Sequence, residues 1–288
     1  ILISSFFFRL YGKLKGGIFS AVLIVIVALI VNWKFLTLPN ILTENIANAI
    51  SGFAISSALI GCIIGGSISG YVSQTAGRKN GLLMAAILFL ISAIGSSIPE
   101  KMNFLGSETI SSFIFYRIVG GVGVGMASML SPMYISEIAP ANIRGKLVSW
   151  NQFAIIFGML VVYFVNYFIA RGQAESWIMN TGWRWMFASE AIPASIFLLM
   201  LFFVPETPRF LVLKQKEDEA LRLLIKTSGI EKANKILKDI KNSLVTKRSS
   251  WLSFGGLVII IGILLSMFQQ FVGINVVLYY ASKIFSNM

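Results

Sequence analysis

The sequence predicts an all-α polytopic membrane protein, and three observations support this prediction. Of the 288 residues, 56% are hydrophobic and 12% are charged, whereas roughly a quarter of an ordinary soluble domain is charged. The apolar residues gather in runs of about 20 residues, the length that a helix needs to cross a bilayer. The basic residues fall unevenly on the joints between these runs. This composition excludes a soluble enzyme, a disordered tail and a disulfide scaffold.

Seven apolar runs are long enough to span a membrane as helices. The first eight residues form a stub that is too short to do so. The predicted spans cover residues 16–36, 49–73, 81–98, 110–133, 147–170, 185–204 and 252–282.

The distribution of lysine and arginine predicts the orientation. With the joints assigned alternately to two sides, one side collects 18 of the 24 basic residues and the other collects five. Eleven of the 18 lie between Arg209 and Arg248. The positive-inside rule then places the N-terminus and the 206–250 loop in the cytoplasm. We expect a multi-pass protein of the plasma membrane (the inner membrane in a bacterium), and the basic balance does not indicate nucleic acid.

The polar segment between the sixth and seventh runs is predicted to contain helices. Ile236, Leu237, Ile240 and Leu244 recur at helical spacing among lysines, and residues 217–226 form a second short candidate. We expect amphipathic helices under the cytoplasmic face, with a solvated charged linker as the alternative.

The residue types that are missing exclude several kinds of site. The sequence has no histidine, which removes His-based zinc sites, Ser-His triads and Cys-His dyads. Cys62 is the single cysteine, so no disulfide can form within the chain. We therefore expect no enzyme, no catalytic residue, no cofactor and no metal.

Glycine-rich stretches in the second and fourth runs predict close helix packing. The second run carries Gly61, Gly65, Gly66 and Gly70, a small-xxx-small spacing that lets two helices approach closely. The fourth run also contains clustered glycines, but Met126 stands where a nucleotide-binding fingerprint needs its third glycine. We expect helix packing here and not nucleotide binding.

Arg117 lies inside the fourth run, where a charge is costly and marks a functional site by default. A structural ion pair with a neighbouring helix is the alternative. No acidic residue precedes Glu44. We expect Arg117 to be the only charge within the spans, with no acid beside it that could exchange a proton.

Carboxamide side chains inside the spans predict a site for a neutral polyol. An amide both donates and accepts hydrogen bonds without the cost of burying a charge. Gln152 lies near the start of the fifth run, and Gln269, Gln270 and Asn275 lie in the seventh. The latter three cannot share one stripe of a regular helix, but a break at Gly273 could gather them at mid-membrane. Hydrogen bonding between helices is the alternative.

Five elements of the sequence together resemble the sugar porters of the major facilitator superfamily. The resemblance covers about residues 41–288, and it is strongest to the bacterial branch that carries D-xylose together with a proton. The elements are Gly77-Arg78-Lys79, Glu137 with Pro140 and Arg144-Gly145-Lys146, Gly182-Trp183-Arg184, PETPRFL at 205–211, and FQQFVGINVVLYY at 268–280.

The resemblance implies twelve helices in two six-helix bundles with the sugar between them. Residues 1–40 would be an atypical N-terminus with the first helix, and residues 41–205 the rest of the N-terminal bundle. Residues 206–250 would form a cytoplasmic helical domain, and residues 251–288 the seventh helix only. We therefore expect an incomplete porter.

The resemblance also implies roles for individual residues. In proton-coupled members an aspartate of the first helix pairs with the arginine at the position of Arg117, which implies a role for Arg117 in proton coupling. The residues implied to contact sugar hydroxyls are Gln152, Gln269, Gln270 and Asn275. Cytoplasmic salt bridges that latch the inward-closed state are implied for Arg78, Glu137, Arg144, Glu206 and Arg209.

The function that these features predict is sugar transport across the membrane by alternating access, with D-xylose–proton symport as the preferred form. The expected partners are a monosaccharide (xylose or glucose), a proton and membrane lipid. We expect this chain alone to be inactive. One alternative is a sugar facilitator without proton coupling. The other is a nonfunctional or regulatory membrane partner that packs against a full-length porter.

Overall fold

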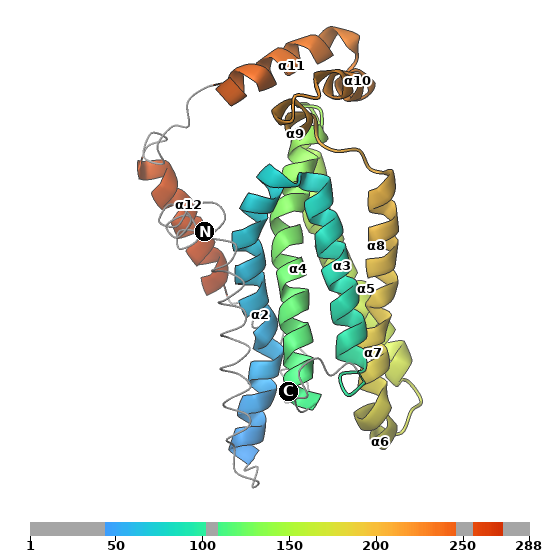
Figure 1. Cartoon of the computed structure of the whole chain (residues 1–288). Helices are drawn as coiled ribbons and strands as arrows, with labels where there is room; N and C mark the ends of the chain where they lie inside the picture. Colours follow the sequence, from blue (N-terminus) through green and yellow to red (C-terminus); the bar gives the residue numbers. More distant parts are fainter. Residues whose placement is uncertain (1–43, 102–108, 246–255, 273–288) are drawn as a thin grey trace. The chain divides into compact units, whose positions relative to one another are not determined.

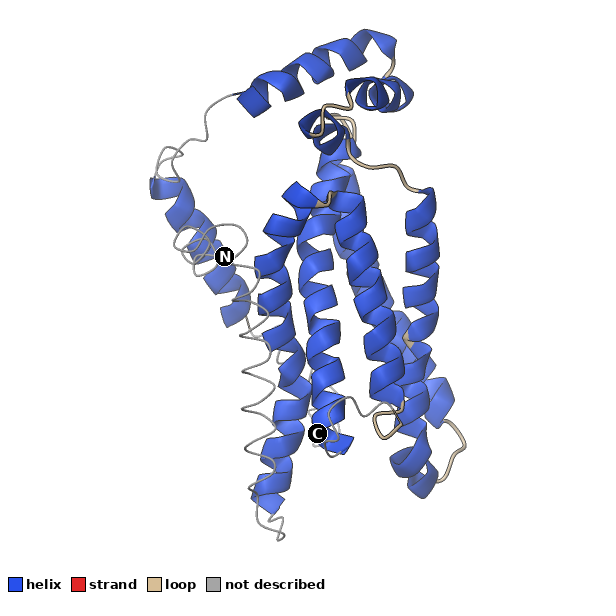
Figure 2. Ribbon diagram, in the orientation of Figure 1, coloured by secondary structure: helices blue, strands red, loops and turns tan. Residues whose placement is uncertain are grey.

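The computed structural model describes residues 44–101, 109–245 and 256–272, and every regular element within them is a helix (Figure 1). Figure 2 shows the same helices joined by short loops. The chain divides into two compact units, residues 1–237 and residues 238–288. The span predicted at residues 16–36 lies outside the described residues.

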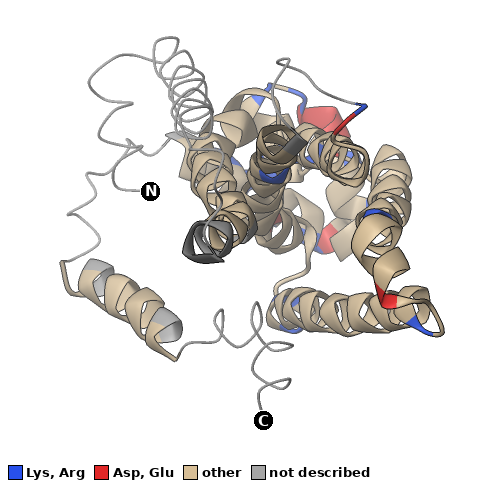
Figure 3. Cartoon of the chain, turned by 90° about the horizontal axis from the view of Figure 1, so that it is seen from below, with Lys and Arg blue, Asp and Glu red and all other residues tan. Residues whose placement is uncertain are grey.

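Five helical stretches are long and apolar enough to cross a membrane. They correspond to the second to sixth predicted spans, and a view along the helices shows charged residues on few of their turns (Figure 3). The stretch that corresponds to the sixth predicted span begins at Glu175 and not at residue 185, because Arg184 interrupts its apolar run. The stretches are Ile50–Thr75, Arg78–Ser97, Ile110–Ile138, Arg144–Ala170 and Glu175–Phe203.

Helices α2 (Glu44–Thr75) and α4 (Thr109–Ile138) pack in direct backbone contact. Gly61 and Gly65 of α2 face the main chain of α4, and Gly121 and Gly125 of α4 face the main chain of α2. A Cβ atom at any of these four positions would overlap the facing backbone. The predicted close packing of the glycine-rich spans is therefore confirmed.

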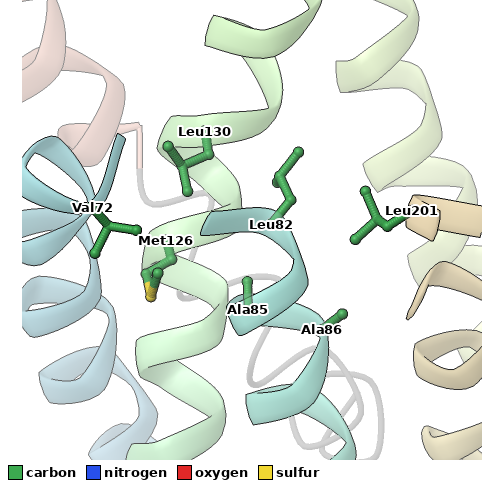
Figure 4. Packing of buried hydrophobic residues seen from close by; sticks show 7 residues of the cluster. All are labelled: Val72, Leu82, Ala85, Ala86, Met126, Leu130 and Leu201. Carbon is green, nitrogen blue, oxygen red and sulfur yellow. The ribbon is translucent and has the colours of Figure 1, made fainter. Parts of the chain in front are cut away.

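Helix α3 (Arg78–Ser97) completes the core between α4 and α8 (Ala191–Phe203). Figure 4 shows the buried apolar side chains that these helices share with the end of α2. Two alanines at successive positions of α3 keep the helices close together. The cluster consists of Val72, Leu82, Ala85, Ala86, Met126, Leu130 and Leu201.

Helix α5 (Arg144–Ala170) differs from α2, α3 and α4 because, in the part of the chain that the structure describes, none of its residues is buried. It contacts α4 and α7 (Trp183–Ser189) along part of its length. An apolar helix exposed to this extent would be costly in water, so its surface fits lipid or further protein helices.

The stretch Glu175–Phe203 is built from four consecutive elements. The short α6 (Glu175–Trp177) leads into the π-helical turn η1 (Ile178–Gly182), and α7 and α8 follow without a break in the chain direction. π-helical turns occur frequently at functional sites.

The polar segment after α8 is helical, as predicted. It forms α9 (Pro208–Leu213), α10 (Glu217–Ser228) and α11 (Ile230–Val245). Thr207 caps α9 by accepting a hydrogen bond from the Phe210 amide, and Pro208 occupies the first turn, where its missing N–H costs nothing.

The second unit contains the end of α11 and helix α12 (Gly256–Phe271). Helix α12 lies within the span predicted at residues 252–282. The predicted helix break at Gly273 and the side chain of Asn275 lie outside the described residues.

We predict that Gly121→Val lowers the free energy of unfolding by about 1–3 kcal/mol, because the new methyl groups must push α2 and α4 apart. The matched control is Gly158→Val on α5, where no atom lies within 4 Å of the added Cβ; it should cost less than about 0.5 kcal/mol. Denaturant unfolding of the purified chain in detergent, followed by circular dichroism, measures both. Equal losses in the two variants would contradict the close α2–α4 contact.

Candidate functional site

The turn between α2 and α3 is held by the carboxylate of Glu206, which comes from the segment after α8. Glu206 Oε1 accepts hydrogen bonds from the backbone amides of Arg78 (3.1 Å), Lys79 (3.2 Å) and Thr207 (2.9 Å). The first amides of a helix have no partner within the helix and carry a partial positive charge. A carboxylate at this position therefore satisfies two of them and is stabilised by the helix dipole.

Gly77 makes this contact possible. Its φ of 100° lies in the left-handed region, and a Cβ at this position would overlap the Glu206 carboxylate. The Gly77-Arg78-Lys79 element thus has a direct physical explanation: the glycine turns the chain and leaves room for the acid.

The Arg78 guanidinium joins the same end of α3 to α2, α4 and α9. It forms an ion pair with Glu137 (2.8 Å), donates to the Ser73 carbonyl oxygen (2.9 Å) and lies 5.8 Å from the centre of the Phe210 ring. Only 9% of the Arg78 side chain and 13% of the Glu137 side chain are exposed. Removing one partner of such a pair leaves an uncompensated buried charge.

Arg144 and Arg209 are placed differently from the other predicted latch residues. Both are exposed, and neither forms an ion pair with any of the described residues. Arg144 donates to the Ala139 carbonyl oxygen at 3.4 Å. Of the five predicted latch residues, the structure therefore brings together Arg78, Glu137 and Glu206.

Arg117 lies half-buried on α4, with its guanidinium carbon 5.7 Å from the centre of the Phe187 ring. It also interacts electrostatically with Glu190, which lies between α7 and α8. The expectation that the spans hold no acid beside Arg117 is wrong. Glu190 falls inside the predicted span 185–204. An acid within a span is the one sequence signal that could have identified Glu190 as a candidate partner of Arg117.

The predicted sugar-binding amides fall in both units. Gln152 lies exposed on α5, one residue after Asn151, which accepts a hydrogen bond from the Ser131 hydroxyl (3.0 Å). Gln269 and Gln270 belong to α12 in the second unit, and their side chains lie outside the described part of the structure. The gathering of these amides around one sugar stays a prediction.

The described residues offer no group of three or more cysteine and acidic side chains that could hold a metal ion. The candidate site consists instead of charged groups on an apolar helical bundle: one centre at the α2–α3 turn, at the end of the bundle, and one around Arg117 within α4. A bundle of this kind defines a polytopic membrane protein of the helical type.

Comparison with known proteins gives the particular family. Residues 17–288 match the family described as "Sugar (and other) transporter". The chain therefore belongs to the sugar transporter family, as the five sequence elements indicated.

Three curated relatives show the range of this similarity. The D-xylose-proton symporter of Escherichia coli K12 is 52% identical over 267 residues, covering 87% of this chain and 54% of the relative. The arabinose-proton symporter of Bacillus subtilis is 43% identical, covering 82% and 50%. The glucose facilitated diffusion protein of Zymomonas mobilis is 37% identical, covering 87% and 54%. The chain thus spans about half the length of these relatives.

Solved structures agree with these relatives. The partially occluded inward-open conformation of the E. coli xylose transporter matches with a TM-score of 0.76 at 52% identity, covering 87% of this chain and 59% of that chain. The structure of the major facilitator superfamily proton:xylose symporter bound to 6-bromo-6-deoxy-D-glucose matches with a TM-score of 0.77, covering 84% and 54%. The predicted fold class is confirmed.

We predict that Arg78→Gln lowers the free energy of unfolding by about 3–5 kcal/mol, because Glu137 is left buried without its charge partner. The control is Lys216→Gln, which breaks the exposed pair with Glu219 and should cost less than about 1 kcal/mol. Thermal unfolding of both purified variants in one detergent gives the comparison. A loss in Arg78→Gln no larger than in the control would show that the buried pair does not hold this end of the bundle.

Proposed function

We propose that this chain forms the first helical bundle, the linker and the seventh helix of a sugar transporter that carries D-xylose together with a proton. The observation that supports this most strongly is the 52% identity to a D-xylose-proton symporter over 87% of the chain. Because the chain spans about half the length of that relative, we propose that it requires the remaining helices for transport.

The cation distribution supports an orientation for the bundle. The α2–α3 turn and the 206–250 segment lie on the side that collects 18 of the 24 basic residues, so we assign both to the cytoplasm. The cluster of Arg78, Glu137 and Glu206 then lies at the cytoplasmic end. Ion pairs at the ends of helices are two-state contacts that can break and re-form as two bundles rock against each other. The exposed Arg144 and Arg209 are free to pair with acids of a second bundle.

The sugar would be held by amides. Gln152 is a polar side chain exposed on a mainly apolar helix, and a polar side chain within a span is expected to face a cavity or a partner. A xylose hydroxyl both donates and accepts hydrogen bonds, as an amide does. Gln269, Gln270 and Asn275 of the seventh helix would complete the set.

Proton coupling would occur at Arg117 and Glu190. Arginine keeps its proton under all physiological conditions, whereas a carboxyl group can take up and release one. Glu190 is exposed on the surface of the chain although it lies within a span. An acid in that position is expected to face a water-filled path or a second bundle and not lipid. Protonation of Glu190 would change the charge beside Arg117 and so change which state of the bundle is favoured.

A facilitator without proton coupling is the second candidate. Two observations favour it: the 37% identity to the glucose facilitated diffusion protein of Z. mobilis, and the lack of any acidic residue before Glu44. The two candidates differ in whether Glu190 matters for uptake driven by a proton gradient.

We predict that the chain alone gives no uptake of labelled D-xylose in transporter-deficient cells, and that co-expression of the missing helices of a related porter restores uptake. In the restored system Gln152→Ala should raise KM about three- to tenfold, the loss expected for one hydrogen bond to the sugar. Gln173→Ala, the same substitution in the loop after α5, is the control. Robust uptake by the chain alone would contradict the proposal that it requires further helices.

We predict that Glu190→Gln removes the dependence of restored uptake on a proton gradient, because the amide cannot carry the proton. Exchange of xylose at equal concentrations on both sides, which needs no net proton movement, should continue. Glu175→Gln, which changes an exposed carboxylate at the start of α6, should leave both rates unchanged. If Glu190→Gln uptake still responds to an uncoupler as the unsubstituted protein does, the facilitator or another proton site is the better account.

A further inference from the structure

A chain of contacts connects the far end of the bundle, opposite the α2–α3 turn, to Arg117. It begins at Arg184, the second residue of α7. Arg184 Nη2 pairs with Glu100 Oε1 at 2.6 Å, and Nη1 donates to the carbonyl oxygen of Ser97, the last residue of α3, at 3.4 Å. Nε donates to the carbonyl oxygen of Asn180 in the π-helical turn at 3.4 Å. All three guanidinium nitrogens therefore have a partner, and the group is fixed in one orientation.

The fixed guanidinium lies against the next group in the chain of contacts, the Trp183 ring, with its carbon 4.5 Å from the ring centre. This distance lies well within the range of a cation–π interaction. Glu100 thus holds Arg184, and Arg184 covers one face of Trp183.

Trp183 belongs to a cluster of three aromatic rings between α4 and α7. Phe113 lies 5.3 Å from Phe187 and 6.2 Å from Trp183, and Trp183 lies 6.3 Å from Phe187. All three pairs meet edge to face, at angles of 77–85° between the ring planes. Because each ring contacts the other two, none can turn without moving its neighbours.

The last contact is between Phe187 and Arg117. Both helices use the same spacing: Phe113 and Arg117 are four residues apart on α4, and Trp183 and Phe187 are four residues apart on α7. Residues with this spacing lie on one face of a helix. Glu190 follows Phe187 by three residues and therefore lies on the same face of the helical stretch. The Arg117 guanidinium, which lies over the Phe187 ring, is thus placed on the side of Glu190.

We propose that Arg184 is a positioning residue for Arg117: held by Glu100, it fixes the Phe113–Trp183–Phe187 cluster, and the cluster holds the Arg117 guanidinium beside Glu190. The ion pair at one end of the bundle thereby sets the position of a charge about 12 Å inside α4, eight residues from the start of that helix. The importance of this positioning for transport rests on the proposed role of Arg117 in proton coupling. The positioning itself does not depend on transport.

The test measures the position of Arg117 directly. Phenylglyoxal reacts with arginine side chains, and mass spectrometry of the full purified chain gives the rate at each arginine. We expect Glu100→Gln to raise the rate at Arg117 about two- to thirtyfold relative to Arg171, the range that the loss of one cation–π contact allows. Phe187→Leu should raise it by a similar factor. Arg78, buried at the opposite end, must keep its low rate, which shows that the bundle remains folded.

The double variant separates positioning from a general loss of structure. The double variant combines Glu100→Gln with Phe187→Leu. If Glu100 acts on Arg117 through the rings, Glu100→Gln has no further effect on the Arg117 rate once Phe187 is leucine, so the two rate factors do not multiply. Glu175→Gln, which removes another carboxylate near the start of the same helical stretch, should leave Arg117 unchanged. An unchanged Arg117 rate in Glu100→Gln, or effects that multiply in the double variant, would overturn the proposal. Because no uptake is measured, these outcomes are independent of whether the chain belongs to a working symporter.

Discussion

The hydrogen bonds from the first amides of α3 to the Glu206 carboxylate are the contact on which one end of the bundle depends. They join two segments that are about 130 residues apart in the sequence, and they place the start of α3 against the segment that follows α8. The same turn delivers Arg78 to Glu137 and to the Phe210 ring. Three helix ends and the beginning of the polar linker are thereby connected by two acids, Glu206 and Glu137, and one base, Arg78.

At the other end of the bundle, the ion pair between Arg184 and Glu100 connects the start of α7 to the end of α3. Between these two ends, the bundle is packed by small residues, with α2 and α4 in backbone contact. Lipid cannot supply a hydrophobic driving force between apolar helices, so close packing and polar contacts must hold them. Within the bundle, the ion pairs Arg78–Glu137 and Arg184–Glu100 each connect different elements of the chain. Arg117 and Glu190 both lie within membrane-spanning stretches, between these two ends.

The sequence was sufficient to predict the second to sixth spans, the close packing of the glycine-rich helices and the helices of the linker, because each rests on a local pattern. The family resemblance grouped Arg78, Glu137 and Glu206, which the structure brings together, with Arg144 and Arg209, which it leaves exposed and outside that group. The sequence did not identify the partner of Arg117, because Glu190 and Arg117 come together only through the packing of α7 on α4. It also started the sixth span too late, because an apolar-run criterion treats Arg184 as a boundary, whereas its charge is compensated by Glu100. For Gln152 and the amides of the seventh helix, no local pattern can show whether they share one site.

Hydrogen exchange at the start of α3 tests the central contact most directly. The amides of Arg78 and Lys79 have no acceptor within their own helix, so their protection depends on Glu206. In Glu206→Ala, the account predicts that exchange of these two amides rises about tenfold or more, as expected for the loss of a hydrogen bond to a charged group. Residues 92–97, at the other end of α3, should exchange as before. Unchanged exchange at Arg78 and Lys79 would contradict the account, because another contact would then be holding this end of the bundle together.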